Sequence, residues 1–228
     1  MKKIILLLAF CLSVGNLFAQ DANADKLREE GDAAMTAKNY PEVVAKYSEY
    51  LKLTNYEDES RVFNCAFAAY NAKKYDDAIK FYDMAIQKGY KTDDAYVGKA
   101  MSLRSQDKAA DFTATVEAGL KANAQNANLE KLLYAYCMKK GQAAQKAGKT
   151  EEAEELFKDV LVVGNAKYKG NALYSLGVMF YNAGAKILAD ANPIATSDPD
   201  KYAAEKKKAD AQMAKAKGYL EQAIALNA

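Results

Sequence analysis

A pattern of small, aromatic and aliphatic residues recurs along this chain with a period of about 35 residues. Tyr40 and Tyr47 have counterparts 35 residues later in Tyr75 and Tyr82, and Phe157 occupies the second of these positions in a later copy. Within each copy the apolar residues are spaced three, four and seven apart, which is the spacing of one face of an α-helix. A single unit of this size cannot bury its apolar face alone, so neighbouring units must stack. The sequence therefore predicts an all-α protein built from repeated helix pairs.

Five copies can be aligned, at residues 24–57, 59–92, 93–127, 134–164 and 170–228. The first two are complete, and the later three are degenerate. Between the third and fourth copies the period lengthens to 41 residues, from Ala109 to Thr150, and the polar sequence NAQNAN at 123–128 predicts a loop there. In the fifth copy an insertion precedes Asp198 and Pro199, residues suited to capping and beginning a helix. Both final helices are expected to be extended, the last from Pro199 to Leu226.

Small residues and large aromatic residues have different roles in the predicted helix pairs. Small residues let the two helices of a pair approach closely, and large aromatic side chains are expected to fill the seams between neighbours and to be buried. Cys65 and Cys137 lie about two repeats apart, too far for a disulfide, which predicts buried free thiols. The small positions are Gly31, Ala66, Gly141 and Gly177, and the seam positions are Tyr47, Tyr82 and Phe157.

The frame of small residue, turn aromatic and seam aromatic resembles the tetratricopeptide repeat, whose period is 34 residues. The resemblance covers residues 24–228, although the Trp and Pro of the family pattern are absent. It implies a right-handed α-solenoid of about five helix pairs, forming a single domain over residues 20–228. It also implies a concave groove, lined by the first helix of each pair, that binds peptides or helices of partner proteins.

The first 19 residues have the composition of a secretory signal peptide. Lys2 and Lys3 precede an apolar run, and Ala19 is a small residue just before the polar sequence QDANAD. The run is shorter than the approximately 20 residues of a membrane span. The mature protein is therefore expected to be exported to the periplasm or secreted, after cleavage behind Ala19. Acylation at Cys11 is an alternative, but only seven apolar residues would then precede the cysteine.

Composition excludes several classes of function. The chain contains no histidine, so the commonest general base and the commonest zinc ligand are absent. Without the signal segment, 30 basic residues face 30 acidic ones, which does not favour nucleic-acid binding. The acidic clusters at 57–59 and 93–94 are predicted to lie at helix starts and not to bind a metal. We expect a protein that is not an enzyme and has no cofactor and no catalytic or metal site.

The groove implied by the resemblance supplies the candidate site. Its aromatic residues either contact a ligand or pack on the neighbouring repeat, and the sequence favours neither alternative. The asparagines could hydrogen-bond a peptide backbone. The candidate groove residues are Phe63, Asn64, Phe67, Tyr70 and Asn71 in the second copy and Asn171, Tyr174, Val178, Tyr181 and Asn182 in the fifth.

A clamp for a peptide's terminal carboxylate is not predicted. Arg28 and Asn64 would fit such a clamp, but Asp32, Asp94 and Gly98 occupy the other groove positions, and the two acids would repel a carboxylate. The expected function is a non-enzymatic scaffold of the cell envelope that binds a protein or peptide in its groove. The alternative is a structural subunit of an envelope assembly that docks through the extended C-terminal helices.

Overall fold

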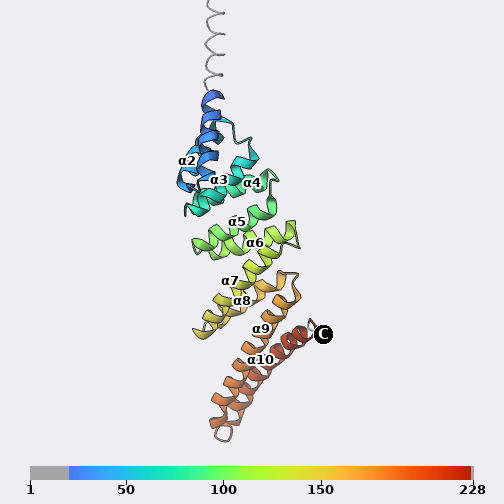
Figure 1. Cartoon of the computed structure of the whole chain (residues 1–228). Helices are drawn as coiled ribbons and strands as arrows, with labels where there is room; N and C mark the ends of the chain where they lie inside the picture. Colours follow the sequence, from blue (N-terminus) through green and yellow to red (C-terminus); the bar gives the residue numbers. More distant parts are fainter. Residues whose placement is uncertain (1–20, 227–228) are drawn as a thin grey trace, which may run out of the picture. The chain divides into compact units, whose positions relative to one another are not determined.

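The computed structural model describes residues 21–226, and these residues form helices joined by short turns, with no strand among them. Figure 1 shows the order of the helices. The predicted all-α helical repeat is confirmed. The helices are residues 21–36, α2 Tyr40–Leu53, α3 Glu59–Asn71, α4 Tyr75–Gln87, α5 Thr92–Ser105, α6 Ala109–Ala122, α7 Ala127–Lys146, α8 Thr150–Asp159, α9 Ala166–Ala191 and α10 Pro199–Ala225, with 3-10 turns η1 Val160–Val162 and η2 Asn192–Ile194.

The chain forms two compact units that meet within α6, one ending at Thr115 and the other beginning at Val116. We call them the N-terminal unit and the C-terminal unit and describe each by itself. The single domain expected over residues 20–228 stays a prediction. The signal segment, including Cys11 and Ala19, lies outside the described residues.

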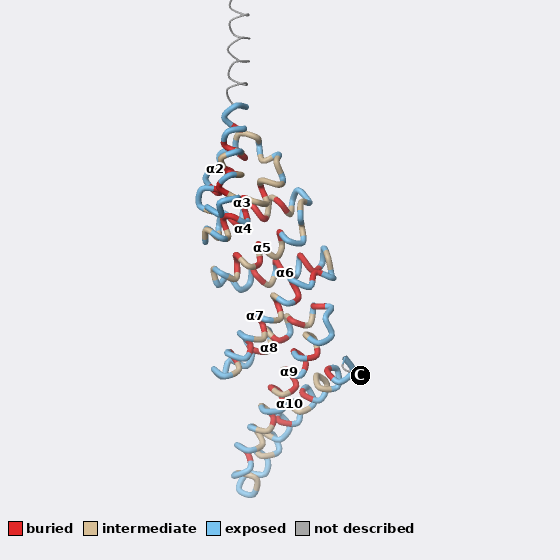
Figure 2. The backbone as a smooth tube through the Cα atoms, viewed as in Figure 1, coloured by how far each residue is buried: buried red, intermediate tan, exposed pale blue. Residues whose placement is uncertain are grey.

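In the N-terminal unit, buried residues recur along the helices between stretches of exposed residues (Figure 2). Tyr47 and Tyr82 are almost fully buried, as predicted. A Cβ atom on Gly31 would lie 2.5 Å from the Tyr47 ring, so the small residue is what allows the helices to approach. Gly98 was expected in the groove, but it is buried against Tyr82, at a site where a Cβ atom would lie 2.1 Å from the ring. Gly98 therefore forms part of the packing.

The C-terminal unit follows the same packing rule. Phe157 on α8 is fully buried, and a Cβ atom on Gly141 of α7 would lie 2.6 Å from its ring. The helices α9 and α10 form a long hairpin, in which three alanines seven residues apart on α10 are buried. Asp198 caps α10 by accepting a hydrogen bond from the Lys201 amide, and the helix begins at Pro199 as predicted. The three alanines are Ala209, Ala216 and Ala223.

The fourth helix pair departs from the predicted repeat boundaries. The helix α7 begins at Ala127, inside the polar sequence NAQNAN, and not near residue 134. It has 20 residues, whereas α3 and α5 have 13 and 14. The longer period between Ala109 and Thr150 therefore arises from a longer helix, and the loop occupies residues 123–126 alone.

The turns inside the first four pairs share one backbone geometry. Each turn has three residues, and the middle one is in the left-handed conformation, with φ between 55° and 75°. The residue after it donates its N–H to a carbonyl five positions back, as Lys74 does to Ala69 at 2.8 Å, which is a Schellman-type helix end. The middle residues are Lys38, Lys73, Asp107 and Gly148.

Replacing Lys73 by glycine should stabilise the N-terminal unit by about 0.5 to 1 kcal/mol. A left-handed conformation costs a residue with a side chain roughly 1 to 2 kcal/mol, and glycine removes this cost. Glycine also has greater conformational freedom in the unfolded chain, which offsets part of the stabilisation. Urea denaturation followed by circular dichroism measures the change. The exposed Lys80, in the middle of α4, is the matched control, and Lys80→Gly should lower stability. Equal destabilisation by both changes would contradict this account.

The two cysteines of the described chain, Cys65 and Cys137, are buried and free, which confirms that prediction. Burial raises the pKa of each thiol to about 12. Both therefore remain protonated at neutral pH, and neither has the character of a reactive nucleophile.

Candidate functional site

The predicted groove residues of α3 are largely used in packing within the N-terminal unit. The Phe63 ring lies edge-on to Tyr82, with 5.8 Å between centroids, and the ammonium group of Lys91 is 5.1 Å from its centre. Tyr70 is half-buried, with its ring 5.9 Å from that of Tyr75. Of the three aromatic candidate residues on α3, Phe63 and Tyr70 therefore follow the packing alternative and lie against other rings of the unit.

Phe67 is the exposed aromatic residue of α3. It is 42% exposed, and its ring lies edge-on to Tyr40 at 5.9 Å. The side chain of Asn71 donates to the carbonyl of Phe67 on the same helix, at 2.8 Å, and Asn64 is half-buried. Phe67 is therefore a single exposed ring and not part of a continuous aromatic surface on α3.

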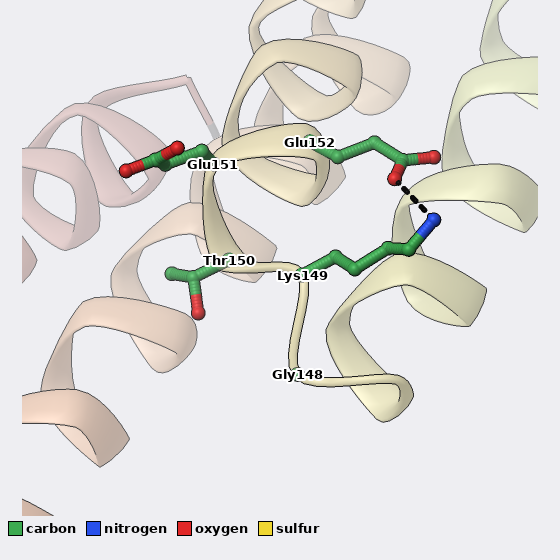
Figure 3. A pocket seen from close by; sticks show the side chains of 5 residues that line it. All are labelled: Gly148, Lys149, Thr150, Glu151 and Glu152. Carbon is green, nitrogen blue, oxygen red and sulfur yellow. Dashed lines mark ion pairs between the residues drawn. The ribbon is translucent and has the colours of Figure 1, made fainter.

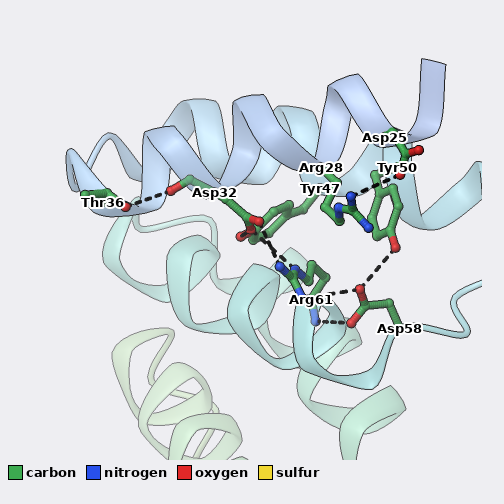
Figure 4. Close-up of polar contacts among 8 residues, drawn as sticks. All are labelled: Asp25, Arg28, Asp32, Thr36, Tyr47, Tyr50, Asp58 and Arg61. Carbon is green, nitrogen blue, oxygen red and sulfur yellow. Dashed lines mark hydrogen bonds and ion pairs between the residues drawn. The ribbon is translucent and has the colours of Figure 1, made fainter. Parts of the chain in front are cut away.

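Charged groups on the first helices of the N-terminal unit neutralise one another (Figure 4). The guanidinium of Arg61 lies between two carboxylates, 2.8 Å from Asp32 Oδ2 and 3.6 Å from Asp58 Oδ2. Tyr47 donates its hydroxyl hydrogen to Asp32, and Tyr50 donates to Asp58 at 3.1 Å. The sequence singled out Asp32 but not its partner Arg61, because 29 residues separate them.

The pKa values of Asp32 and Arg61 are shifted in the directions that this network predicts. Burial alone would raise the pKa of Asp32, but hydrogen bonds from Arg61 and Tyr47 outweigh it and hold that pKa below its usual value. The hydrogen bond with Asp32 raises the pKa of Arg61. Asp32 and Arg61 therefore stay charged and paired, and neither is free to bind the carboxylate of a peptide.

The predicted groove residues of α9 present an exposed surface. Tyr174 is 60% exposed and Tyr181 is 54% exposed, with the half-buried Val178 between them. Asn171 and Asn182 are exposed on the same helix. Residues spaced three, four and seven apart share a helix face, so these five side chains form one stripe along α9.

The stripe continues onto α7 through a pair of tyrosines that the sequence did not identify. The rings of Tyr134 and Tyr168 are stacked, with centroids 4.3 Å apart and planes 12° apart. Asn171 donates its side-chain amide to the Tyr134 hydroxyl at 2.9 Å. We call the α9 stripe with these two tyrosines the α7/α9 face.

A buried carboxylate holds this face together. Glu130 on α7 is almost fully buried, and its Oε1 accepts hydrogen bonds from the backbone N–H groups of Gly164 and, at 3.1 Å, Asn165. Asn165 in turn caps α9 by accepting from the Tyr168 amide at 3.1 Å. Glu130 thus fixes the start of α9 against α7, one turn before Tyr134.

A surface depression lies at the start of α8, lined by Gly148, Lys149, Thr150, Glu151 and Glu152 (Figure 3). Lys149 is paired with Glu152 at 3.1 Å, so the cation is already neutralised. The two glutamates lie in the first turn of the helix, where they favour the dipole and repel an anion. The depression has the features of a helix start and not of a ligand site.

The acidic clusters behave as helix starts, as predicted. Asp58 caps α3 by accepting from the Arg61 amide at 3.0 Å, and Asp93 and Asp94 lie in the first turn of α5. In residues 21–226 there is no group of three or more carboxylate or thiol side chains that could hold a metal ion. None of the helices described is long and apolar enough to cross a membrane.

The chain is similar to a solved structure over most of its length. A TPR repeats protein from Bacteroides fragilis NCTC 9343 is 46% identical, with 89% of this chain and 91% of that chain aligned and a TM-score of 0.83. No family model matches the chain.

A curated relative is the Hsp70-Hsp90 organizing protein 1 of Glycine max, 30% identical over 154 residues, or 64% of this chain. The alignment spans 26% of that protein, about a quarter of its length. The repeated helix pairs, their buried seam aromatics and the Bacteroides fragilis structure agree, and the chain belongs to the tetratricopeptide repeat family.

Proposed function

We propose that this protein is a non-enzymatic interaction module that binds a partner protein through the α7/α9 face. The observation that carries the proposal is the exposure of Tyr174 and Tyr181 on a first helix of the repeat. Large aromatic side chains in such a row are typical of interface anchors, which often contribute 2 kcal/mol or more to binding. On α3, by contrast, Arg61 is paired with Asp32 and the Phe63 ring packs on Tyr82. The predicted groove residues of α3 are therefore a poorer candidate for partner binding than the α7/α9 face.

Site-specific crosslinking tests this proposal. The photo-crosslinking residue p-benzoylphenylalanine is placed at Tyr174 or at Tyr181, with Lys207 on α10 as the exposed control position. Illumination in the native host should give a defined crosslinked protein from the two tyrosine positions and not from the control. Tyr174→Ala should leave the thermal melt unchanged, because the side chain is exposed. Absence of a crosslink at both tyrosines would contradict the proposal.

We also propose export to the cell envelope, on the basis of the N-terminal sequence. The intact mass of the protein purified from its native host should correspond to a chain that begins at Gln20. A mass that retains Met1 to Ala19, or a chain that begins at an acylated Cys11, would contradict cleavage behind Ala19.

A second candidate function is that of a structural subunit docking through the α9/α10 hairpin. The observation that favours it is the exposure of apolar side chains at the end of α10, where Ile224 is 68% exposed and Leu226 is 37% exposed. The same crosslinking residue can be placed at position 224. A crosslinked protein that is obtained from position 224, and not from positions 174 and 181, would favour this alternative.

A further inference from the structure

We propose that two copies of this protein pair through the outer stripe of α10, which consists of Ala214, Lys217, Glu221 and Ile224. The two helices run antiparallel about a two-fold axis. This inference rests on the second candidate function, because it uses the same end of α10, and it specifies a second copy of the chain as the docking partner. It does not depend on partner binding at the α7/α9 face.

An aliphatic residue follows each seam position by four residues in all five copies. Leu51 is fully buried and Leu120 is 7% exposed, and Ile86 and Leu161 are half-buried. The next first helix packs on such a second helix, as α3 does on α2, α5 on α4 and α9 on α8. The equivalent residue of α10, Ile224, is 68% exposed, so it has the side chain of a stacking position at the surface. The seam positions used here are Tyr47, Tyr82, Val116, Phe157 and Leu220.

Two charged residues lie beside the exposed isoleucine. Lys217 and Glu221 form an ion pair at 3.7 Å, and their side chains are 76% and 64% exposed. The equivalent positions of α8 carry Glu154 and Lys158, which are also paired. There the Glu154 side chain is only 21% exposed, and Lys158 interacts with Tyr219 of the next helix pair. An ion pair at these two positions is therefore compatible with a packed interface.

The outer stripe is complementary to itself. Residue 219 lies midway between Lys217 and Glu221, and it also lies midway between Ala214 and Ile224. Two antiparallel copies of α10 that cross at this level place Lys217 opposite Glu221 of the second copy. They also place Ile224 opposite the small, exposed Ala214 of the second copy. A two-fold axis makes both contacts twice, whereas a parallel arrangement would bring like charges together.

A glycine lies beside the proposed crossing point. A Cβ atom on Gly218 would have no atom of this chain within 4 Å, whereas Cβ atoms on Gly177 and Gly184 of α9 would meet atoms of α10. Glycine inside a helix is destabilising relative to alanine, and here nothing in its own chain packs against it. In the proposed pair, the missing side chain lets the second helix approach closely.

The first two helices offer no matching surface for head-to-tail stacking. Residues 21–53 expose no large apolar side chain, and Lys26 and Glu29 are among the exposed residues of the first helix. Head-to-tail stacking would place Ile224 against such polar groups, whereas a two-fold pair closes on itself. Without the signal segment, 30 basic residues balance 30 acidic ones, so two copies meet without net repulsion.

Sedimentation velocity of the purified full mature chain, over a range of concentrations, tests the inference. The parent should form a reversible dimer. Ile224→Asp should sediment as a monomer at the concentrations where the parent is a dimer, because two apolar contacts are replaced by charges without a partner. Val162→Asp, at a 51% exposed position of η1, is the matched control and should pair like the parent. Unchanged melting temperatures of the dilute proteins would show that both variants are folded.

Charge reversals test the antiparallel arrangement. Lys217→Glu and Glu221→Lys should each weaken pairing about ten-fold or more, because opposite charges across the interface become like charges. The double variant Lys217→Glu/Glu221→Lys should pair like the parent, and an equal mixture of the two single variants should form a mixed dimer. Lys207→Glu, about three turns before the crossing point, is the charge control and should pair like the parent.

Two results would overturn the inference: a parent chain that is a monomer at every concentration, or a dimer that Ile224→Asp and the charge reversals leave intact. If crosslinking from position 224 then captures a different protein in the native host, the second candidate function stands and pairing with a second copy is wrong. If position 224 gives no crosslink either, the end of α10 is not a docking surface. Crosslinking from positions 174 and 181 tests the α7/α9 face separately.

Discussion

Alanine in place of Phe157 should lower the free energy of unfolding by about 3 to 5 kcal/mol. The ring is fully buried between α7 and α8 and fills the space left by Gly141, where a Cβ atom would lie 2.6 Å from it. Truncation leaves a cavity that the surrounding helices cannot close, because their spacing was set by the ring. Tyr82→Ala should have a similar effect in the N-terminal unit, since Tyr82 is 3% exposed.

Urea denaturation followed by circular dichroism measures both effects. Tyr174→Ala is the matched control, an aromatic truncation at a 60% exposed position, and should change stability by less than about 0.5 kcal/mol. If Phe157→Ala and Tyr82→Ala unfold at the urea concentration of the parent, these rings are not the seams of the repeat.

Glu130→Ala should destabilise the C-terminal unit by about 3 kcal/mol. The carboxylate accepts hydrogen bonds from the amides of Gly164 and Asn165, and bonds to a charged group contribute about 1.5 to 3 kcal/mol each. Removal leaves both N–H groups without this partner and loosens the start of α9 against α7. Glu130→Gln keeps an acceptor oxygen without the charge, so it should cost roughly half as much.

Hydrogen exchange gives the residue-level measurement. In Glu130→Ala the amides of Gly164 and Asn165 should exchange faster at a temperature where Phe157 remains buried and the unit is folded. Glu154→Ala on α8 is the control, because it removes an ion pair that is partly exposed to solvent. Equal protection of the two amides in parent and variant would show that Glu130 does not fix the start of α9.

Features that depend on residues close in sequence could be predicted well. The period relates Tyr40 to Tyr75 and Ala109 to Thr150, and these four residues are the first residues of α2, α4, α6 and α8. The caps at Asp58 and Asp198 follow from the local preference of carboxylates for helix starts. Burial of Tyr82 and Phe157 follows from the helical spacing of apolar residues.

The turn geometry was not predictable from composition. Left-handed residues at helix ends are usually glycine, and Gly148 fits that rule, but Lys38, Lys73 and Asp107 occupy the same position in the other turns. The tight three-residue connection imposes this conformation on whichever residue stands there. The extension of α7 into NAQNAN was missed because Asn126 can cap a helix as well as form a loop, and its side chain caps α7.

The candidate site could be predicted only in part. Spacing placed Phe63, Phe67 and Tyr70 on one helix face, but the exposure of each ring depends on partners elsewhere in the chain, such as Tyr82 and Tyr75. The α9 stripe was identified by the same reasoning, and there the rings are exposed. Tyr134 and Glu130 were missed because their partners lie 34 or more residues away, beyond any helical pattern.

The constant three-residue turn has a consequence for how such a chain can change in length. Within the first four pairs the turn allows no extra residue, because its backbone hydrogen bonds fix the distance between two helices. The connectors between pairs differ instead, with residues 54–58, 88–91, 123–126 and 160–165 filling them. Among the connectors, 160–165 is held by Glu130 and those at 54–58 and 88–91 contain the same type of hydrogen bond as the turns. Insertions are therefore expected to be tolerated best between the exposed Ala124 and Gln125 of connector 123–126 and rejected at the turns, so a protein engineer could graft a new segment there without disturbing a helix pair.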